Sequence, residues 1–155
     1  IRMKQRVHEP LTLSMGQLLA DRVRQRLADA PPDLLAPVPS YWLKRLWRGF
    51  NGPDLLAEAL GRRLGVPVAD DLLACRRRTQ KQGTLMPSER AANVRDAFAF
   101  NPDYDIAGSH LLLVDDIMTT GSTASEAARM LRRAGAGRVT VAGVARGVGL
   151  AQRRS

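Results

Sequence analysis

Residues Leu111–Thr123 have the sequence LLLVDDIMTTGST, and this stretch decides the fold. Its four leading apolar residues, 111–114, are typical of a strand buried on both faces of a parallel sheet. The polar residues that follow, from Asp115 to Gly121, predict a loop at the carboxyl end of that strand. In open α/β sheets this is the edge at which ligands bind.

A helix and a second strand follow this loop. Ser122 or Thr123 is expected to cap the helix, because Thr123 and Glu126 have the spacing of a capping box. Gly135 is expected to end the helix, and the β-rich residues 138–145 form the next strand. A strand–helix–strand unit of this kind predicts two parallel strands.

The rest of the chain alternates between helical and strand-like periodicity, which favours an α/β fold. A first helix is expected to begin at a capping box formed by Ser14 and Gln17, and to stop at Pro31-Pro32. Its inner face is predicted to hold Met15, Leu18, Leu19, Val23 and Leu27. Further helices are expected at 53–64 and from Ser88 to about 94, and strands at 33–39, 72–75 and 97–100.

The carboxylates and hydroxyls of the deciding stretch indicate a ligand with two chemically different ends. The run Thr119, Thr120, Gly121, Ser122 and Thr123 offers backbone N–H groups and hydroxyls at a helix start, which suits a phosphate. Asp115 and Asp116 accept hydrogen bonds when ionised, so a sugar diol or a metal suits them. A ribose 5-phosphate has both ends.

Strand-end motifs of other protein classes fit this stretch less well. Paired aspartates also end strands in response-regulator receivers, but the hydroxyl-rich loop would then have no role. Neither a P-loop nor a Rossmann glycine pattern is present. The remaining alternative is a structural strand, loop and helix with polar residues placed by chance.

Composition is that of one soluble domain. The chain has 155 residues, of which 45% are apolar and 25% charged. The single cysteine, Cys75, excludes an internal disulfide and a cysteine-rich zinc site, and is expected to be a small core residue. No apolar run is long enough to span a membrane and the start does not resemble a signal peptide, so we expect a cytoplasmic location.

The net charge of +9, from 24 basic and 15 acidic residues, indicates a polyanionic partner or a solvated basic surface. Only three of the basic residues are lysine, and no acidic residue follows Glu126. Seven arginines follow it, namely Arg129, Arg132, Arg133, Arg138, Arg146, Arg153 and Arg154. His8 and His110 are expected at the surface or at a strand edge.

The deciding stretch resembles the phosphoribosyl-pyrophosphate (PRPP) binding motif of type I phosphoribosyltransferases. Other short motifs make the chain similar to the ComF family of competence-associated, phosphoribosyltransferase-like proteins. These are Pro37-Val38-Pro39, Arg48-Gly49-Phe50-Asn51, Arg78-Thr79 with Gln82 and Leu85, Glu89-Arg90, Asn93 and Ala97-Phe98. Family members usually carry a cysteine-rich zinc module before this domain. Its absence here means either a fragment or a divergent member.

The resemblance implies an α/β type I phosphoribosyltransferase fold, a mainly parallel sheet flanked by helices. Residues 33–155 would form the phosphoribosyltransferase-like domain, and residues 1–32 a helical segment acting as a partial hood. It implies a pyrophosphate-binding loop with Arg45 and Arg48, although this loop could merely pack Trp42, Trp47 and Phe50 on the core. It also implies a flexible loop over the reaction centre with Arg76, Arg77, Arg78, Lys81 and Gln82, whose alternative is a solvated charge run.

The implied reaction transfers the phosphoribosyl group of PRPP to a nitrogenous acceptor and releases pyrophosphate, as in nucleotide metabolism. Mg²⁺ would act through the ligand and through Asp115 and Asp116, the candidate catalytic residues. A second hypothesis is a non-catalytic competence protein that binds nucleotides or single-stranded DNA, or works with the DNA-uptake machinery. A third is a PRPP-sensing regulator. The acceptor base is not indicated, and a homodimer is left open.

Overall fold

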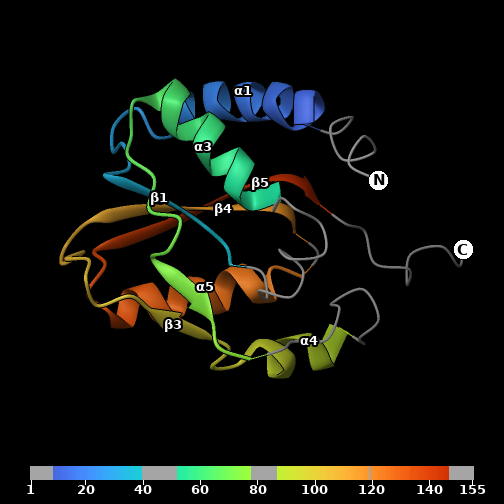
Figure 1. Ribbon diagram of the computed structural model, residues 1–155, viewed down its shortest axis with the longest axis vertical. Helices are drawn as coiled ribbons and strands as arrows, with labels where there is room; N and C mark the ends of the chain where they lie inside the picture. The colour runs from blue at the N-terminus through green and yellow to red at the C-terminus, as the bar shows by residue number, and fades with distance from the viewer. Residues whose placement is uncertain (1–8, 40–51, 78–86, 119, 147–155) are drawn as a thin grey trace, which may run out of the picture.

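A three-stranded parallel sheet forms the centre of the protein. The structure, a computed structural model, describes residues 9–39, 52–77, 87–118 and 120–146 (Figure 1). Strands β1 (Leu34–Pro37), β4 (His110–Met118) and β5 (Arg138–Arg146) pair in the order β1-β4-β5. Both pairings are parallel, and the one between β4 and β5 is the pairing that the strand–helix–strand unit predicts. The carboxyl ends of the three strands therefore meet at one edge.

The central strand β4 is buried on both faces. Its residues 111–114 are fully buried, and successive side chains enter different apolar clusters. Leu111 and Leu113 pack with Leu131 of α5 (Ser122–Arg133), while Leu112 and Val114 pack with Leu60 of α3 (Gly52–Leu64). Each such side chain contributes about 1.5–3 kcal/mol when removed from water. This two-sided burial explains the unbroken apolar run.

One face of the sheet is covered by α3 and by α1 (Glu9–Arg26), and the opposite face by α5 (Figure 1). The two covering helices approach closely, because a Cβ on Gly16 would lie 2.9 Å from the Cβ of Ala59. Ala20 and Val23 continue this inner face of α1.

The bounds of α3 agree with the predicted helix 53–64 to within one residue. Gly65 directly follows the helix and has a φ of 73°.

Three details predicted for α1 are wrong, and the first is its end, which lies at Arg26 rather than at Pro31-Pro32. The helix already begins at Glu9, so Ser14 lies inside it and cannot be its N-cap. Leu18 is 71% exposed, because the contact with α3 runs along the small residues Gly16 and Ala20 instead. Met15, Leu19 and Leu27 are partly buried and Val23 is buried, as predicted.

A second, antiparallel unit packs below the sheet beside α5 (Figure 1). It consists of β2 (Leu73–Cys75), α4 (Pro87–Val94) and β3 (Phe98–Phe100), and we call it the β2–β3 arm. Phe98 and Leu73 join the apolar cluster under α5, and Cys75 packs against that cluster. Strands and helix agree with the predicted positions, except that α4 starts at Pro87, which fits the first turn of a helix better than its interior.

His110 is buried at a strand edge rather than placed at the surface. It is the first residue of β4 and only 8% exposed. Its Nδ1 lies 3.2 Å from the carbonyl oxygen of Pro31, and its Nε2 lies 2.8 Å from Oγ1 of Thr140. Both ring nitrogens therefore have a hydrogen-bond partner. The two contacts join His110 to the segment before β1 and to β5, at the edge of the sheet opposite Asp115 and Asp116. His8 lies outside the described residues.

In the described ranges, no helix combines the length and apolarity needed to cross a membrane.

Candidate functional site

Asp115 and Asp116 lie at the carboxyl edge of the sheet, but inside strand β4 rather than in a loop. β1 pairs with β4 only as far as Val114, whereas β5 continues beside it to Met118. Pairing with β5 alone extends the strand, which is why the expected loop from Asp115 is wrong over residues 115–118. The acidic pair therefore lies just beyond the last residue of β4 that pairs with β1.

Asp115 and Asp116 leave the strand on opposite faces, because successive residues of a strand alternate, but their carboxyl groups still interact with each other. Asp116 lies on the side of α3. A Cβ built on Gly52, the first residue of that helix, would come within 2.8 Å of Oδ2 of Asp116. The amino end of a helix carries partial positive charge, so α3 offers a favourable environment to this carboxylate.

The surroundings of Asp115 favour its protonated form. Burial, followed by repulsion from the adjacent Asp116, raises the pKa of Asp115 to about 7. Its Oδ1 accepts a hydrogen bond from the backbone N–H of Asp116 at 2.9 Å, and the N–H of Ile117 donates to Oδ1 of Asp116 at 2.8 Å. Asp115 thus gains or loses its proton near neutral pH, and strongly shifted carboxyl groups of this kind are typical of functional sites.

The hydroxyl-rich segment turns directly into α5 through Gly121. This residue is the N-cap of the helix and has a φ of 78°, a left-handed conformation that glycine adopts without strain. The prediction that Ser122 or Thr123 caps the helix is wrong, because the helix starts at Ser122 and its N-cap has no side chain. A glycine N-cap has no side chain to accept the N–H groups of the first helical turn, and such N–H groups can bind an anion.

Around this turn the structure brings together part of the predicted phosphate-binding set. Oγ1 of Thr120 lies 2.8 Å from Oγ of Ser122, so the two hydroxyls flank the glycine. Thr119 lies outside the described residues. Figure 1 shows the first turns of α3 and α5 at the edge where β4 and β5 end, on opposite faces of the sheet.

The predicted pyrophosphate-binding residues are described only in part. Arg45, Arg48, Arg78, Lys81 and Gln82 lie outside the described residues. Arg76 and Arg77 follow β2 and are exposed. Nη2 of Arg77 donates to the carbonyl oxygen of Arg95 at 2.8 Å, and the backbone N–H of Arg76 donates to the carbonyl of Ala97 at 2.8 Å.

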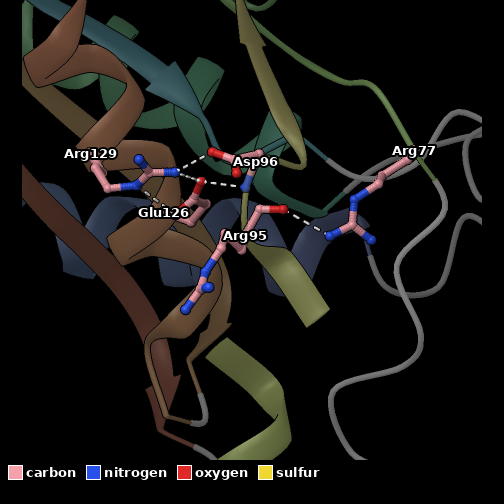
Figure 2. Close-up of polar contacts among 5 residues, drawn as sticks. All are labelled: Arg77, Arg95, Asp96, Glu126 and Arg129. Atoms are coloured by element: carbon pink, nitrogen blue, oxygen red, sulfur yellow. Dashed lines mark hydrogen bonds and ion pairs between the residues drawn. The ribbon is translucent and has the colours of Figure 1, made fainter. Parts of the chain in front are cut away.

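Glu126 has a role that its spacing from Thr123 did not suggest. Its carboxylate accepts the backbone N–H of Asp96 at 2.7 Å and the Nε of Arg129 at 2.8 Å (Figure 2). The carboxylate is therefore occupied by the β2–β3 arm and by its own helix. The i,i+3 spacing of Glu126 and Arg129 was the signal in the sequence that could have indicated an ion pair.

A protein-family match agrees with this geometry. The family model described as "Phosphoribosyl transferase domain" matches residues 55–152, which include the acidic pair and the glycine turn. The chain belongs to this phosphoribosyltransferase family. The parallel sheet flanked by helices is accordingly the type I phosphoribosyltransferase fold that the sequence predicted.

Curated relatives of this protein confirm the resemblance to the ComF family of phosphoribosyltransferase-like proteins. "Competence protein F" of Haemophilus influenzae is 34% identical over 116 residues, covering 74% of this chain and 51% of the relative. "DNA utilization protein YhgH" of Escherichia coli K12 is 39% identical over 111 residues, covering 71% and 48%. The chain thus spans about half the length of the curated relatives it matches.

Solved structures similar to this phosphoribosyltransferase-family chain share its fold. A purine phosphoribosyltransferase from Pyrococcus horikoshii has a TM-score of 0.56 at 16% identity, covering 85% of this chain and 73% of the other. The hypoxanthine phosphoribosyltransferase of Trypanosoma cruzi complexed with the product IMP has a TM-score of 0.55 at 16% identity, covering 92% and 76%. At these identities the likeness concerns the fold alone.

The acidic pair also fits the metal that the phosphoribosyltransferase fold implies. No group of three or more metal-ligating side chains occurs among the described residues. Mg²⁺ does not need such a cage, since it is usually held by one or two carboxylates together with water and the phosphates of a substrate. Two adjacent carboxylates near the start of α5 suit that mode of binding.

Proposed function

We propose that the protein binds PRPP with Mg²⁺ and transfers its phosphoribosyl group to a nitrogenous acceptor, with release of pyrophosphate. One observation carries this proposal. Two carboxylates at the carboxyl end of β4 are followed, within about five residues, by a left-handed glycine that is the N-cap of α5. The first group suits ribose hydroxyls and the second suits the 5-phosphate.

The chain's own residues would act by binding and orientation. Asp115 and Asp116 would hold the ribose hydroxyls, and Thr120, Gly121 and Ser122 the 5-phosphate, so that the C1 carbon faces the acceptor nitrogen. The C1–oxygen bond breaks with its electron pair going to pyrophosphate, and the nitrogen forms the new bond to C1 and loses a proton. Such a reaction depends mainly on positioning and charge stabilisation. When bound by the acidic pair, Mg²⁺ would supply positive charge toward the leaving group.

Arginines would complete the charge balance at the pyrophosphate. Arg76 and Arg77 are exposed at the end of β2, and guanidinium groups bind phosphate oxygens in a bidentate manner. Arg45, Arg48, Arg78, Lys81 and Gln82 remain further candidates from the sequence. Nitrogenous bases are the natural acceptors for such chemistry, which supports a role in nucleotide metabolism in the cytoplasm.

The test is a screen of nucleobases and small amines for pyrophosphate release from PRPP in the presence of Mg²⁺. The proposal expects release with at least one acceptor and none when Mg²⁺ is chelated. PRPP binding without release for any acceptor would favour a regulator that senses PRPP. Absence of both binding and release would overturn the enzyme and the sensor together.

A second candidate function is binding of single-stranded DNA or a nucleotide without catalysis. It is favoured by the names of the relatives, which refer to competence and DNA utilization, and by the net charge of +9. Phosphate contacts make affinity fall with salt, with a slope of roughly −0.7 per contact for single strands. Binding of an oligonucleotide with such a slope would support this function, and absence of binding at low salt would contradict it. Analytical ultracentrifugation of the protein used for this titration would show whether it forms a homodimer.

A further inference from the structure

A continuous series of polar contacts runs from α5 to the end of β2 (Figure 2). Glu126 of α5 accepts the backbone N–H of Asp96, at the neck of the β2–β3 arm between α4 and β3. The carbonyl of the preceding residue, Arg95, accepts a hydrogen bond from Arg77 at 2.8 Å. Arg77 is one of the residues expected to contact pyrophosphate, and α5 is the helix whose start is expected to bind the 5-phosphate.

The neck of the arm has a backbone conformation that needs support. Asp96 has a φ of 52°, and it is the one residue other than glycine with a positive φ among those described. Such a conformation strains most side chains, and Asp and Asn tolerate it best. Here it directs the N–H of Asp96 to Glu126 and its carboxylate to Nη2 of Arg129, at 2.7 Å in each case.

Glu126 is suited to hold this neck rigidly. Its side chain is only 10% exposed, and Arg129 donates to both of its oxygens. The hydrogen bond from Arg129, together with the N–H of Asp96, lowers the pKa of Glu126, so the carboxylate stays ionised. Charge-assisted hydrogen bonds of this kind are shorter and stronger than neutral ones.

The other end of the series is exposed and has less support. Arg77 is exposed, so packing restricts its guanidinium less than a buried side chain, and its described hydrogen bond is the one to Arg95. The orientation of Arg77 therefore depends on where the carbonyl of Arg95 lies. That position in turn depends on the conformation of Asp96, which Glu126 fixes.

We propose that Glu126 is a positioning residue that sets Arg77 toward the pyrophosphate end of the ligand, by holding the neck of the β2–β3 arm against the phosphate-binding helix. This inference rests on the proposed function. It predicts that Glu126 affects the pyrophosphate end of PRPP and leaves the binding of the ribose phosphate end unchanged. A merely structural ion pair would affect both ends equally.

The test compares two ligands, PRPP and ribose 5-phosphate, titrated with Mg²⁺ into the full chain by calorimetry. Glu126→Ala is expected to weaken PRPP about tenfold or more, as for the loss of one charge-assisted hydrogen bond, and to leave ribose 5-phosphate within about twofold. Glu126→Gln keeps an oxygen acceptor for the N–H of Asp96 and should restore most of the PRPP affinity. Glu58→Ala, which removes an exposed carboxylate paired with Arg62 on α3, is the matched control and should change neither affinity.

The variant Arg77→Met tests the same series from its exposed end, and it remains informative if Glu126→Ala does not fold. It should also weaken PRPP selectively, and in its background the substitution of Glu126 by Gln or Ala should have no further effect. Equal weakening of both ligands by Glu126→Ala, or an unchanged affinity of Arg77→Met for PRPP, would overturn the inference alone. A wild-type chain that binds neither ligand would overturn the proposed function, and the inference with it.

Discussion

Replacing Asp115 by Asn is expected to stabilise the protein above neutral pH. The pKa of Asp115 rises from 3.8 to about 7 because the carboxyl group is partly buried and faces Asp116. Ionising it in the folded state therefore costs on the order of 4 kcal/mol at high pH. Water reaches the partly exposed pair and screens some of this cost, so we expect a gain of roughly 2 kcal/mol for Asp115→Asn at about pH 8. The amide oxygen of Asn still accepts the N–H of Asp116.

The pH dependence gives this prediction its sign. Between about pH 4 and pH 7 the folded state retains a proton at Asp115 that the unfolded chain has lost. The contribution of Asp115 to stability is thus fully present below about pH 4 and is lost as the pH rises through about 7. Urea unfolding of the wild type and of Asp115→Asn, at about pH 4 and about pH 8, measures the difference directly. The variant should gain at the higher pH and show little change at the lower.

Glu58→Gln is the control for this experiment, because it removes a carboxylate from an exposed pair with Arg62. Such a pair contributes about 0.5 kcal/mol or less, so Glu58→Gln should change the stability by no more than this at either pH value. Equal stability of the wild type and Asp115→Asn at the higher pH would refute the reasoning, as would a variant that is less stable there. Either result would mean that the acidic pair is not strained in the folded state.

Two further predictions concern the glycine turn and the face of α1. Gly121→Ala should cost roughly 1 kcal/mol in urea unfolding, since a φ of 78° strains any side chain, and it should weaken the binding of ribose 5-phosphate. Gly65→Ala has the same strain at the end of α3, with equally open space around it, and should leave that binding unchanged; weakened binding in both variants would contradict a local role for Gly121. Leu18→Ser should change stability by less than about 0.5 kcal/mol, whereas Ala20→Leu should cost about 1–3 kcal/mol in thermal unfolding, because Ala20 is fully buried against α3. A larger loss of stability for Leu18→Ser than for Ala20→Leu would contradict this packing of α1 on α3.

Much of the fold could be predicted from the sequence because its strongest signals are local. The apolar run 111–114, the helix ending at Gly65 and the strand–helix–strand order each follow from short-range rules of periodicity and capping. The inner face of α1 could not be predicted so well. Hydrophobicity favoured Leu18, but the helix packs through Gly16 and Ala20, whose small size matters only beside α3.

The candidate site, like the fold, could be predicted from the sequence only in part. The types and order of Asp115, Asp116 and Gly121 have a direct chemical meaning, so their place between the central strand and the next helix could be predicted. The extension of β4 through Met118 was missed because it depends on pairing with β5, which residue types do not reveal. The link from Glu126 to Asp96 joins residues 30 apart in sequence, and capping-box spacing suggested a different partner.

The most direct test of the proposed site is a calorimetric titration of PRPP with Mg²⁺ into the wild type and into the double variant Asp115→Asn, Asp116→Asn. We predict that the wild type binds, and that the folded double variant binds at least about tenfold more weakly, because its amides are poorer acceptors for the ribose hydroxyls and for Mg²⁺. A circular dichroism spectrum should confirm that the fold is retained. Unaltered PRPP affinity in the double variant would contradict the assignment of the site.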